Sequence, residues 1–474
     1  MKLTDEQQAI IARRPTQTIK VSAFAGCAKT STLERYARAW PMPSLYLAFN
    51  RSIADEARGR FPPCCETRTA HSFAYRALDI RRRGNVVPKL RQEHLRPYEQ
   101  HLDGVAGMTD GQVRTAVIRT IENFAMDAGA VFKPEHCTAK TEGQRLEVRR
   151  MAAAVTGEML RFEEHQHAIT HDLYLKRFEL YHRIDGPYKY LLLDESQDLS
   201  PVLISIVEKA NLPTIVVGDP WQSIYRFRGA VDAMDAFDAP ELPLTQSWRF
   251  GPEIARLANF VLRHSSRPPR SKIKGNPARA TTVSRYTGRV RPGRGTAILA
   301  RTNARLFDSL VNIDRAFHLV GGLADLTRQL LSAHALWKGR LDDVLDPGVQ
   351  RFSSWRALDH AAEIGDGEAR RLRDIILKHG DRLPSLLQRL KGHHKDDEAE
   401  AELVVSTAHR SKGREWEVVY VLDDFENPGE FVKRRQADPN KTEEMDQEVN
   451  LLYVALSRAV RELHLAPDLF AALA

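Results

Sequence analysis

The sequence has few cysteines and no long apolar run. Its four cysteines, among 474 residues, form no CxxC pair, so we predict neither a disulfide framework nor a zinc site. No apolar run approaches the roughly 18 residues that a membrane-spanning helix needs, and the first residues are acidic and polar where a signal peptide would be basic and then apolar. We therefore expect reduced thiols and a cytoplasmic location.

Acidic residues are absent from one long stretch of an otherwise mixed sequence. No Asp or Glu occurs from Ile254 through Phe307, while the formal charge of the whole chain is +8. Cations of this stretch include Arg263, Arg267, Arg270, Lys272, Lys274, Arg279, Arg285, Arg289, Arg291 and Arg294. Such a stretch suits a phosphate-binding surface, but a basic, solvated pair of loops gives the same pattern, and both interpretations stay open.

Short apolar runs that end in turns predict two α/β regions. Strand-like runs lie at 18–23, 44–49, 188–194 and 214–218, and again at 297–300, 403–406 and 418–422. Parallel sheets of this kind are covered by helices on both faces and bind ligands beyond the carboxyl ends of their strands. The stretch 77–180 has helix-like segments without strand signals, and 324–389 is mostly helical, so we expect a mainly helical insertion in each region.

The segment 23–30, AFAGCAKT, has the features of a phosphate-binding loop. It follows a predicted strand and precedes a helix-like segment, and its small residues allow backbone N–H groups to curl around phosphates. Lys29 is placed to reach the β and γ phosphates, and the Thr30 hydroxyl to bind Mg²⁺. The string alone also occurs by chance, because Ala28 stands where a glycine is usual, but its strand–turn–helix setting favours the phosphate loop.

Two further segments carry groups suited to nucleotide hydrolysis. Asp194 and Glu195 end a predicted strand, where one carboxylate can hold Mg²⁺ and the other polarise the attacking water; a capped helix start is the alternative. After the next strand, Gln222 could sense the γ phosphate. Tyr225, Phe227 and Arg228 then combine aromatic faces with a cation, as single-stranded bases and backbone require, although aromatic residues at this spacing are also common in cores.

Three later segments complete an ordered motif set: SWRF at 247–250, TAHRSKGREWE at 407–417 and EVNLLYVALSRA at 448–459. With them the chain resembles the UvrD/Rep/PcrA-type superfamily 1A DNA helicases over residues 3–459. The segments LYLAFNRSIADEA, TAHSFAYRA, THDLYLK and HLVGGL are most similar to the helicase region of the F-box DNA helicases. We expect no F-box, because the sequence begins at the first helicase motif.

The resemblance implies two RecA-like P-loop lobes with parallel sheets, each carrying a mainly helical insertion. We place the first lobe at 1–76 and 181–246, with its insertion at 77–180. The second lobe is placed at 247–311 and 398–474, with a short insertion at 312–397. ATP and Mg²⁺ are the implied cofactors, bound between the lobes.

The resemblance also implies which residues bind the nucleotide. Gln7 would read the adenine edge, Trp248 would stack on the base and Glu415 would lie near the ribose. Arg249 and Arg458 would act as arginine fingers, with Lys29, Glu195 and Gln222 completing the catalytic set and Thr30 and Asp194 holding the metal. The full nucleotide-binding set is Gln7, Ala25, Gly26, Cys27, Ala28, Lys29, Thr30, Ser31, Trp248, Arg249, Glu415 and Arg458.

A second implied set contacts single-stranded DNA: Phe49, Asn50, Thr69, His71, Tyr225, Phe227, Arg228 and His409. Gln222 would couple the γ phosphate to this DNA, and Glu448 matches a motif residue whose role stays open. The departures from the family pattern are few. Ala28 in place of glycine either tunes nucleotide affinity by crowding the loop or is tolerated because its φ can be negative. Arg410 and Ser411 replace a commoner, smaller pair.

The implied activity is that of an ATP-dependent 3′–5′ single-stranded DNA translocase and helicase in DNA repair, recombination or replication. Single-stranded DNA and single-strand/duplex junctions are the expected partners, with recombinase filaments or other DNA-bound proteins as further candidates. A DNA-stimulated ATPase that remodels protein–DNA complexes without unwinding is the main alternative, and RNA as the track stays open. A P-loop small-molecule kinase is disfavoured, since it gives no role to Trp248, Arg249 or segment 407–417.

Overall fold

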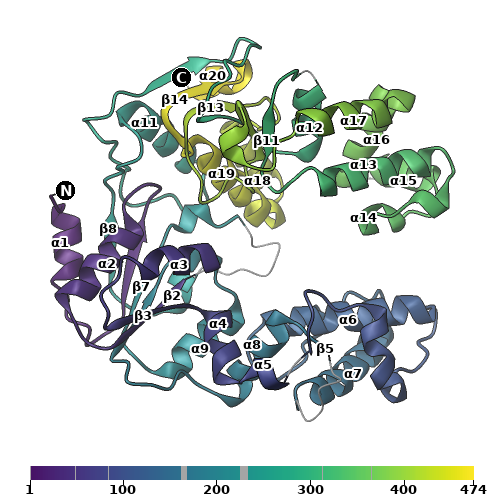
Figure 1. The fold of residues 1–474 in the computed structure, drawn as a ribbon, viewed down its shortest axis with the longest axis horizontal. Coiled ribbons are helices and arrows are strands. Elements are labelled where there is room, and N and C mark those ends of the chain that lie inside the picture. Colours follow the sequence, from purple (N-terminus) through teal and green to yellow (C-terminus); the bar gives the residue numbers. More distant parts are fainter. Residues whose placement is uncertain are drawn as a thin grey trace. The chain divides into compact units, whose positions relative to one another are not determined.

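The computed structural model describes residues 2–48, 50–83, 85–161, 168–224, 233–311, 313–363 and 366–473. The chain divides into two compact units, Met1–Thr245 and Gln246–Ala474, drawn from purple to teal and from teal to yellow in Figure 1. Each unit is built on a six-stranded sheet whose strands are all parallel. The predicted α/β class with parallel sheets is confirmed. The four-part division into lobes and insertions stays a prediction.

The first sheet has the strand order β3-β2-β6-β7-β1-β8. Its strands are β1 (Ile19–Ala23), β2 (Ser44–Ala48), β3 (Cys65–Thr69), β6 (Tyr190–Leu193), β7 (Thr214–Gly218) and β8 (Glu241–Leu244). The inner strands β2, β6 and β7 are buried at every residue, as expected of a parallel sheet covered on both faces. The edge strands β3 and β8 are only partly buried.

Helices of the first unit cover the sheet and continue into a helical region. Around the sheet lie α1 (Asp5–Ile11), α2 (Lys29–Ala39), α3 (Arg51–Arg58), α4 (Ala70–Ala77), α9 (Pro201–Ala210) and α10 (Ala233–Ala236), with the 3₁₀ helices η3 (Ser196–Asp198) and η4 (Pro220–Gln222). The helical region holds α5 (Ile80–Arg83), η1 (Gln92–His101), α6 (Asp110–Met126), η2 (Pro134–His136), α7 (Glu142–Met159) and α8 (His171–Tyr181) (Figure 1). Val117 of α6 and Met151 of α7 share one apolar core with Leu191 and Val216 of the sheet.

The helical region also contains one small strand pair. The two-residue strands β4 (Asn85–Val86) and β5 (Ala168–Ile169) pair in parallel. The expectation that 77–180 lacks strands was therefore wrong in this detail. Two residues are too short a run to show a period of two, so the sequence pattern could not reveal them.

The second sheet has the strand order β11-β12-β10-β13-β14-β9. Its strands are β9 (Thr282–Arg285), β10 (Thr296–Ala300), β11 (Phe317–Leu319), β12 (Leu403–Thr407), β13 (Trp416–Val421) and β14 (Ala459–Leu465). Helices packed with it include α11 (Pro252–Leu262), α12 (Asn303–Val311), α18 (Pro428–Ala437), α19 (Thr442–Leu456) and α20 (Pro467–Leu473).

Between β11 and β12 the second unit is helical. The helices are α13 (Ala324–Trp337), η6 (Leu341–Asp343), α14 (Pro347–Gln350), α15 (Trp355–Glu363), α16 (Gly367–His379), η7 (Gly380–Arg382), α17 (Leu383–His393) and η8 (Glu398–Glu400), with η9 (Pro439–Lys441) later in the unit. Leu330 and Ile376 of this region share a core with Ile298 and Val405 of the sheet. Within the described residues, no helix is both long and apolar enough to cross a membrane.

Candidate functional site

The loop between β1 and α2 is shaped by two residues in the left-handed region. Gly26 has φ of 73° and Ala28 has φ of 58°. Ala28 directly precedes α2 and caps it with no side-chain hydrogen bond, so the first turn of the helix presents its N–H groups without a side-chain partner at the cap. A helix N-terminus of this kind attracts anions, because its N–H groups and dipole both favour negative charge.

The conformation of Ala28 corrects one expectation. We allowed that alanine is tolerated there because its φ can be negative, and the observed φ of 58° shows that this explanation is wrong. A left-handed alanine carries a steric cost of about 1 to 2 kcal/mol that glycine avoids. The other explanation, an effect on nucleotide affinity, stays a prediction.

Asp194 lies at the carboxyl end of β6 and joins three segments of the first unit. Its Oδ2 accepts hydrogen bonds from Thr30 Oγ1 at 2.6 Å and from Tyr46 Oη at 2.9 Å, and its Oδ1 accepts one from the Glu195 N–H at 2.9 Å. The side chain is buried, and this burial, followed by the nearby Glu195 carboxylate, raises the pKa of Asp194. The Thr30 hydroxyl and the Asp194 carboxylate are oxygen ligands side by side, the donor type that Mg²⁺ prefers.

Glu195 takes the left-handed conformation, with φ of 52°, just before the 3₁₀ helix η3. Its carboxylate lies 3.5 Å from Lys29 Nζ and accepts a hydrogen bond from Gln197 Nε2 at 2.6 Å. The structure therefore brings together Lys29, Thr30, Asp194 and Glu195, which the sequence placed far apart. Tyr46 and Gln197 are additional members that the sequence reasoning missed.

A chain of hydrogen bonds leads from Glu195 to Gln222. Gln197 Oε1 accepts from the Asp219 N–H at 2.9 Å, and Asp219 Oδ2 accepts from Gln222 Nε2 at 2.6 Å. A Cβ atom at Gly218 would clash with the side chains of Ser196 and Gln197, so a glycine is needed for this approach. The network depends on β6 and β7 being neighbours in the sheet, which no local sequence signal shows.

Gln7 lies on α1 and is buried against the phosphate-loop helix. Its Nε2 donates to Thr32 Oγ1 of α2 at 3.0 Å, and its Oε1 accepts from the Thr4 N–H at 3.1 Å in a capping box. An amide has two N–H donors and two oxygen lone pairs, so each end keeps one further hydrogen-bonding capacity. Gln7 is thus placed beside the phosphate loop, while its contact with adenine stays a prediction.

The predicted DNA-contacting residues of the first unit fall in two groups. Phe49, Tyr225, Phe227 and Arg228 lie outside the described residues. Asn50 caps α3 by accepting from the Ile53 N–H, and Thr69 caps α4 by accepting from the Ser72 N–H, so both side chains already have a role in the fold.

His71 lies in the first turn of α4 and has contacts with α8. Its Nε2 is 3.3 Å from Asp172 Oδ1, and its ring meets those of His171 and Tyr174 edge to face. Both His171 and Asp172 belong to the THDLYLK segment that carries the family resemblance, but the sequence gave them no individual role. The contact between α4 and α8 thus brings together TAHSFAYRA and THDLYLK, two of the segments that are similar to the F-box DNA helicases.

In the second unit, Arg249 and Glu415 form an ion pair. Arg249 Nε donates to Glu415 Oε2 at 2.6 Å, and its Nη1 donates to the Ser457 carbonyl at 3.0 Å. Trp248, which directly precedes Arg249 in the chain, is half-buried. The structure therefore brings Arg249 and Glu415, two of the predicted nucleotide residues, together beside Ser457.

Arg458 is buried and bound to its own unit. Its guanidinium donates to the carbonyls of Val454 at 2.9 Å and Arg414 at 3.1 Å and to Ser457 Oγ at 2.9 Å. These bonds tie the end of α19 to the segment before β13. His409, predicted to contact DNA, lies half-buried in the turn after β12. Arg410 packs its guanidinium against Gly321 and donates to the Val320 carbonyl at 3.2 Å.

Glu448 has a bidentate partner that the sequence did not identify. Arg301, just after β10, donates to Glu448 through Nε at 2.6 Å and also through Nη2. The backbone of the same turn is held by Asp424, which accepts from the N–H groups of Arg301 at 2.9 Å and Thr302 at 2.8 Å. Burial raises the pKa of Asp424, and these N–H donors oppose the shift.

Comparison with known proteins gives the same assignment from both halves of the chain. The model of the UvrD/REP helicase N-terminal domain matches residues 3–238, and that of the UvrD-like helicase C-terminal domain matches residues 359–467. DNA helicase IV of Escherichia coli is 29% identical over 143 residues, which cover 25% of this chain and 21% of that protein.

F-box DNA helicases match over nearly the whole chain. F-box DNA helicase 1 of Gallus gallus is 29% identical over 510 residues, covering 99% of this chain and 49% of that protein. F-box DNA helicase protein 1 of Schizosaccharomyces pombe is 28% identical over 510 residues, covering 97% of this chain and 57% of that protein. This chain thus spans about half the length of these curated relatives. The predicted likeness is confirmed, and the chain belongs to the UvrD/REP helicase family.

Proposed function

We propose that this chain is an ATP-dependent DNA helicase that moves 3′ to 5′ along single-stranded DNA in repair, recombination or replication. The observation that carries the proposal is the cluster at the phosphate loop, where Thr30 bonds to Asp194 and Lys29 pairs with Glu195. The family membership and the names of the relatives support DNA as the track.

Within this cluster each group has a distinct task. Lys29 and the N–H groups at the start of α2 bind the β and γ phosphates of ATP. Thr30 and Asp194 would hold Mg²⁺, whose charge would neutralise the phosphate oxygens as negative charge moves between them. The short bond between Thr30 and Asp194 keeps both oxygen ligands on one side of the loop.

Glu195 is proposed as the general base. Its carboxylate accepts a proton from the water that attacks the γ phosphate, a role that typically contributes 10²–10⁴-fold in rate. Gln197 holds one carboxylate oxygen through its Nε2, so the carboxylate is kept in one orientation. Lys29 Nζ lies 3.5 Å from the other carboxylate oxygen, so both oxygens of Glu195 have a partner in the cluster.

Gln222 is proposed to couple the nucleotide to DNA. It is connected to Glu195 through Asp219 and Gln197, and it lies three residues before Tyr225, the first of the aromatic residues proposed to stack on bases. Arg249 and Arg458 are proposed as the cations of the second unit that act on the phosphates, with Trp248 on the base and Glu415 near the ribose.

Strand displacement on three duplexes tests the activity and its direction. We expect unwinding of a duplex with a 3′ single-stranded tail, dependent on ATP and Mg²⁺, and little unwinding of 5′-tailed or blunt duplexes. The polarity is supported by the resemblance of the ordered motifs to 3′–5′ members of superfamily 1. Preference for the 5′ tail would contradict the polarity. Removal of streptavidin from the 5′ end of a single strand without any unwinding would favour the remodelling ATPase instead.

A further inference from the structure

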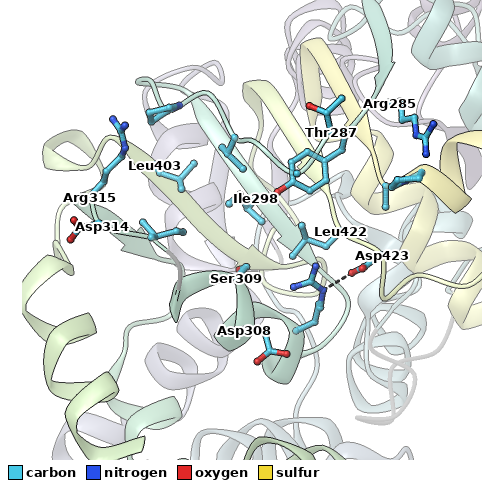
Figure 2. A pocket seen from close by; sticks show the side chains of 18 residues that line it. Arg285, Thr287, Ile298, Asp308, Ser309, Asp314, Arg315, Leu403, Leu422 and Asp423 are labelled. Atoms are coloured by element: carbon cyan, nitrogen blue, oxygen red, sulfur yellow. Dashed lines mark hydrogen bonds and ion pairs between the residues drawn. The ribbon is translucent and has the colours of Figure 1, made fainter. Parts of the chain in front are cut away.

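The second unit contains a groove that the proposed helicase activity does not use. Its volume is about 850 Å³, and every residue that lines it belongs to the second unit. The floor is the sheet, with Ile298 of β10 and Leu422 after β13. One wall is α12, with Arg305 and Ser309, and the opposite wall is the segment 285–292 that follows β9 (Figure 2).

The groove is long and has polar ends. Figure 2 shows Arg285 and Thr287 at one end and Asp314 and Arg315 at the other, with Ile298 and Leu422 between them. Ile298 and Leu422 are each 2% exposed and form the bottom of the groove, and half-buried Tyr286, Val290 and Ile313 add accessible apolar surface beside them. An occupant must therefore be elongated, with an apolar group near its middle.

Most charges around the groove are already compensated. Arg305 pairs with Asp423, and Arg315 lies 3.6 Å from Glu402. On the acidic side, Asp308 lies 3.0 Å from Lys378. Asp314 lies 3.3 Å from His393, which balances its charge only when the imidazole is protonated. These pairs leave no excess of positive charge at the α12 side or at the Arg315 end of the groove.

Arg285 is different from the other charged lining residues. Its side chain is exposed at the end of the edge strand β9, and no carboxylate pairs with it among the residues that the structure describes. Arg289 and Arg291 follow in the same wall segment, also exposed and also without an ion-pair partner in the described part of the chain. The uncompensated charge at this end is positive, so it favours an acidic group on the occupant.

The lining suits a peptide better than a nucleic acid. The α12 side and the Arg315 end have no excess of positive charge, so a continuous phosphate backbone would meet uncompensated cations, among the described lining residues, only at the Arg285 end. Tyr286 is the single aromatic residue among the lining side chains that the structure describes, and its ring already packs edge to face on Tyr420 at 5.5 Å. Single-stranded nucleic acid needs several open aromatic faces, whereas an aliphatic floor accepts an aliphatic side chain.

We propose that this groove docks a short peptide segment of a partner protein, with an apolar side chain on the Ile298–Leu422 floor and an acidic side chain at Arg285. The partner's peptide thus carries one apolar side chain that binds the floor, with acidic residues on one side of it. This surface is separate from the residues proposed to bind ATP and DNA, so its function can be tested without changing them.

Selection from displayed peptides of random sequence tests the proposal. The full chain serves as bait, and the Ser309→Trp variant, in which the indole would fill the groove, serves for counter-selection. Enriched peptides, made synthetically with a fluorescent label, are then titrated against wild type, Ser309→Trp, Arg285→Glu and Arg279→Glu. Arg279→Glu is the matched control, because Arg279 is exposed, carries the same charge and lies outside the groove. Circular dichroism checks that each variant is folded.

We expect enriched peptides that combine an apolar residue with carboxylates, lose binding to Ser309→Trp, and bind Arg285→Glu at least about tenfold more weakly. Affinity for Arg279→Glu should stay within about twofold of wild type. The proposal is overturned if no peptide is enriched, or if enriched peptides bind Ser309→Trp or Arg285→Glu as well as they bind wild type. Labelled oligodeoxythymidylate is titrated in parallel, and a loss of its affinity in the groove variants would overturn the peptide in favour of DNA. If Ser309→Trp does not fold, Arg285→Glu alone decides.

Discussion

Both units contain the same strand–helix connection, but the N–H groups near the start of the helix have different partners in the two units. In both, a helix follows an inner strand of a six-stranded parallel sheet, α2 after β1 and α12 after β10. In the first unit no side chain caps the helix, and Lys29 and Thr30 stand at its first turn. In the second, Asp424 accepts hydrogen bonds from the N–H groups of Arg301 and Thr302 and from the Thr302 hydroxyl.

The difference would explain why we propose a phosphate site at this helix start in the first unit and none at the corresponding helix start of the second. N–H groups at a helix start favour an anion whether it is a phosphate or a carboxylate. In the second unit Asp424 accepts from the two N–H groups just before α12, and Thr302 Oγ1 accepts from the Arg305 N–H in its first turn, so protein groups already occupy this position. In the first unit no side chain caps the helix, and we propose that a phosphate of the nucleotide binds there. Four changes would break or sharpen this comparison.

Lys29→Ala should have the largest effect. Removing the cation at the open helix start should lower ATP turnover by at least about 100-fold, the usual loss when a preorganised charge donor is removed from a transferring phosphoryl group. The fold should persist, because Lys29 belongs to neither the fully buried residues nor the apolar core of the first unit. Steady-state ATPase with single-stranded DNA measures this, and Arg35→Ala, an exposed cation on the same helix, is the control. Near wild-type turnover in a folded Lys29→Ala protein would contradict the proposal that residues 23–30 form a phosphate-binding loop.

Glu195→Gln should reduce turnover by about 10²–10⁴-fold, because the amide cannot accept the proton of the attacking water. ATP affinity should stay close to that of wild type, which equilibrium binding of a fluorescent nucleotide would measure. Glu208→Gln, an exposed change on α9, is the control. A fall in ATP binding as steep as the fall in turnover would make Glu195 a structural or metal-holding residue.

Asp424→Ala should destabilise the second unit by about 1 to 3 kcal/mol, since three hydrogen bonds to a carboxylate are lost at a helix start. Amide hydrogen exchange at residues 301–305 should rise with it. Asp423→Ala is a close control: Asp423 pairs with Arg305 at a half-exposed position, and its loss should cost less than about 1 kcal/mol. Equal stability of the two variants would show that the carboxylate of Asp424 does not stabilise the turn.

Ala28→Gly should have the smallest effect. Glycine relieves the left-handed strain of about 1 to 2 kcal/mol but adds unfolded-state entropy of about 0.4 to 1 kcal/mol, so we expect stability equal to or slightly above that of wild type. Ala153→Gly, at an exposed position in the middle of α7, should instead cost about 0.5 to 1 kcal/mol. Urea unfolding distinguishes the two, and equal losses would mean that the strain at Ala28 is negligible.

Sequence patterns predicted the inner strands well and missed the edges. The run at 214–218 coincides with β7, because a strand buried on both faces is a continuous apolar run. The missed strands β3, β8, β9 and β11 are the four sheet edges, where half-exposed residues and short lengths give no such run. The inner strand β14 was missed for another reason, since its sequence AVRELHL carries charged and polar residues between the apolar ones and forms no continuous apolar run.

Residue types at the candidate site were predictable, but their connections were not. Lys29, Thr30, Asp194 and Glu195 follow strands in the sequence, and parallel strands end at one edge of a sheet. The left-handed backbone of Ala28 and Glu195 contradicts ordinary residue preferences, so no pattern shows it. The contacts of Tyr46 with Asp194 and of Gln197 with Asp219 join distant segments, and only the order of strands in the sheet creates them.

The side-chain amide of Gln197 connects the turn after β6 to the turn after β7 through two hydrogen bonds. Along the chain, Glu195 and Gln222 are separated by α9 and β7, but through hydrogen bonds only Gln197 and Asp219 stand between them. The link also has a direction, since Nε2 donates at one end and Oε1 accepts at the other. A shift of η4 that moves the Asp219 N–H would lengthen its bond to Gln197 Oε1 or move Gln197 and the Glu195 carboxylate with it, so we expect the positions of the two turns to be coupled.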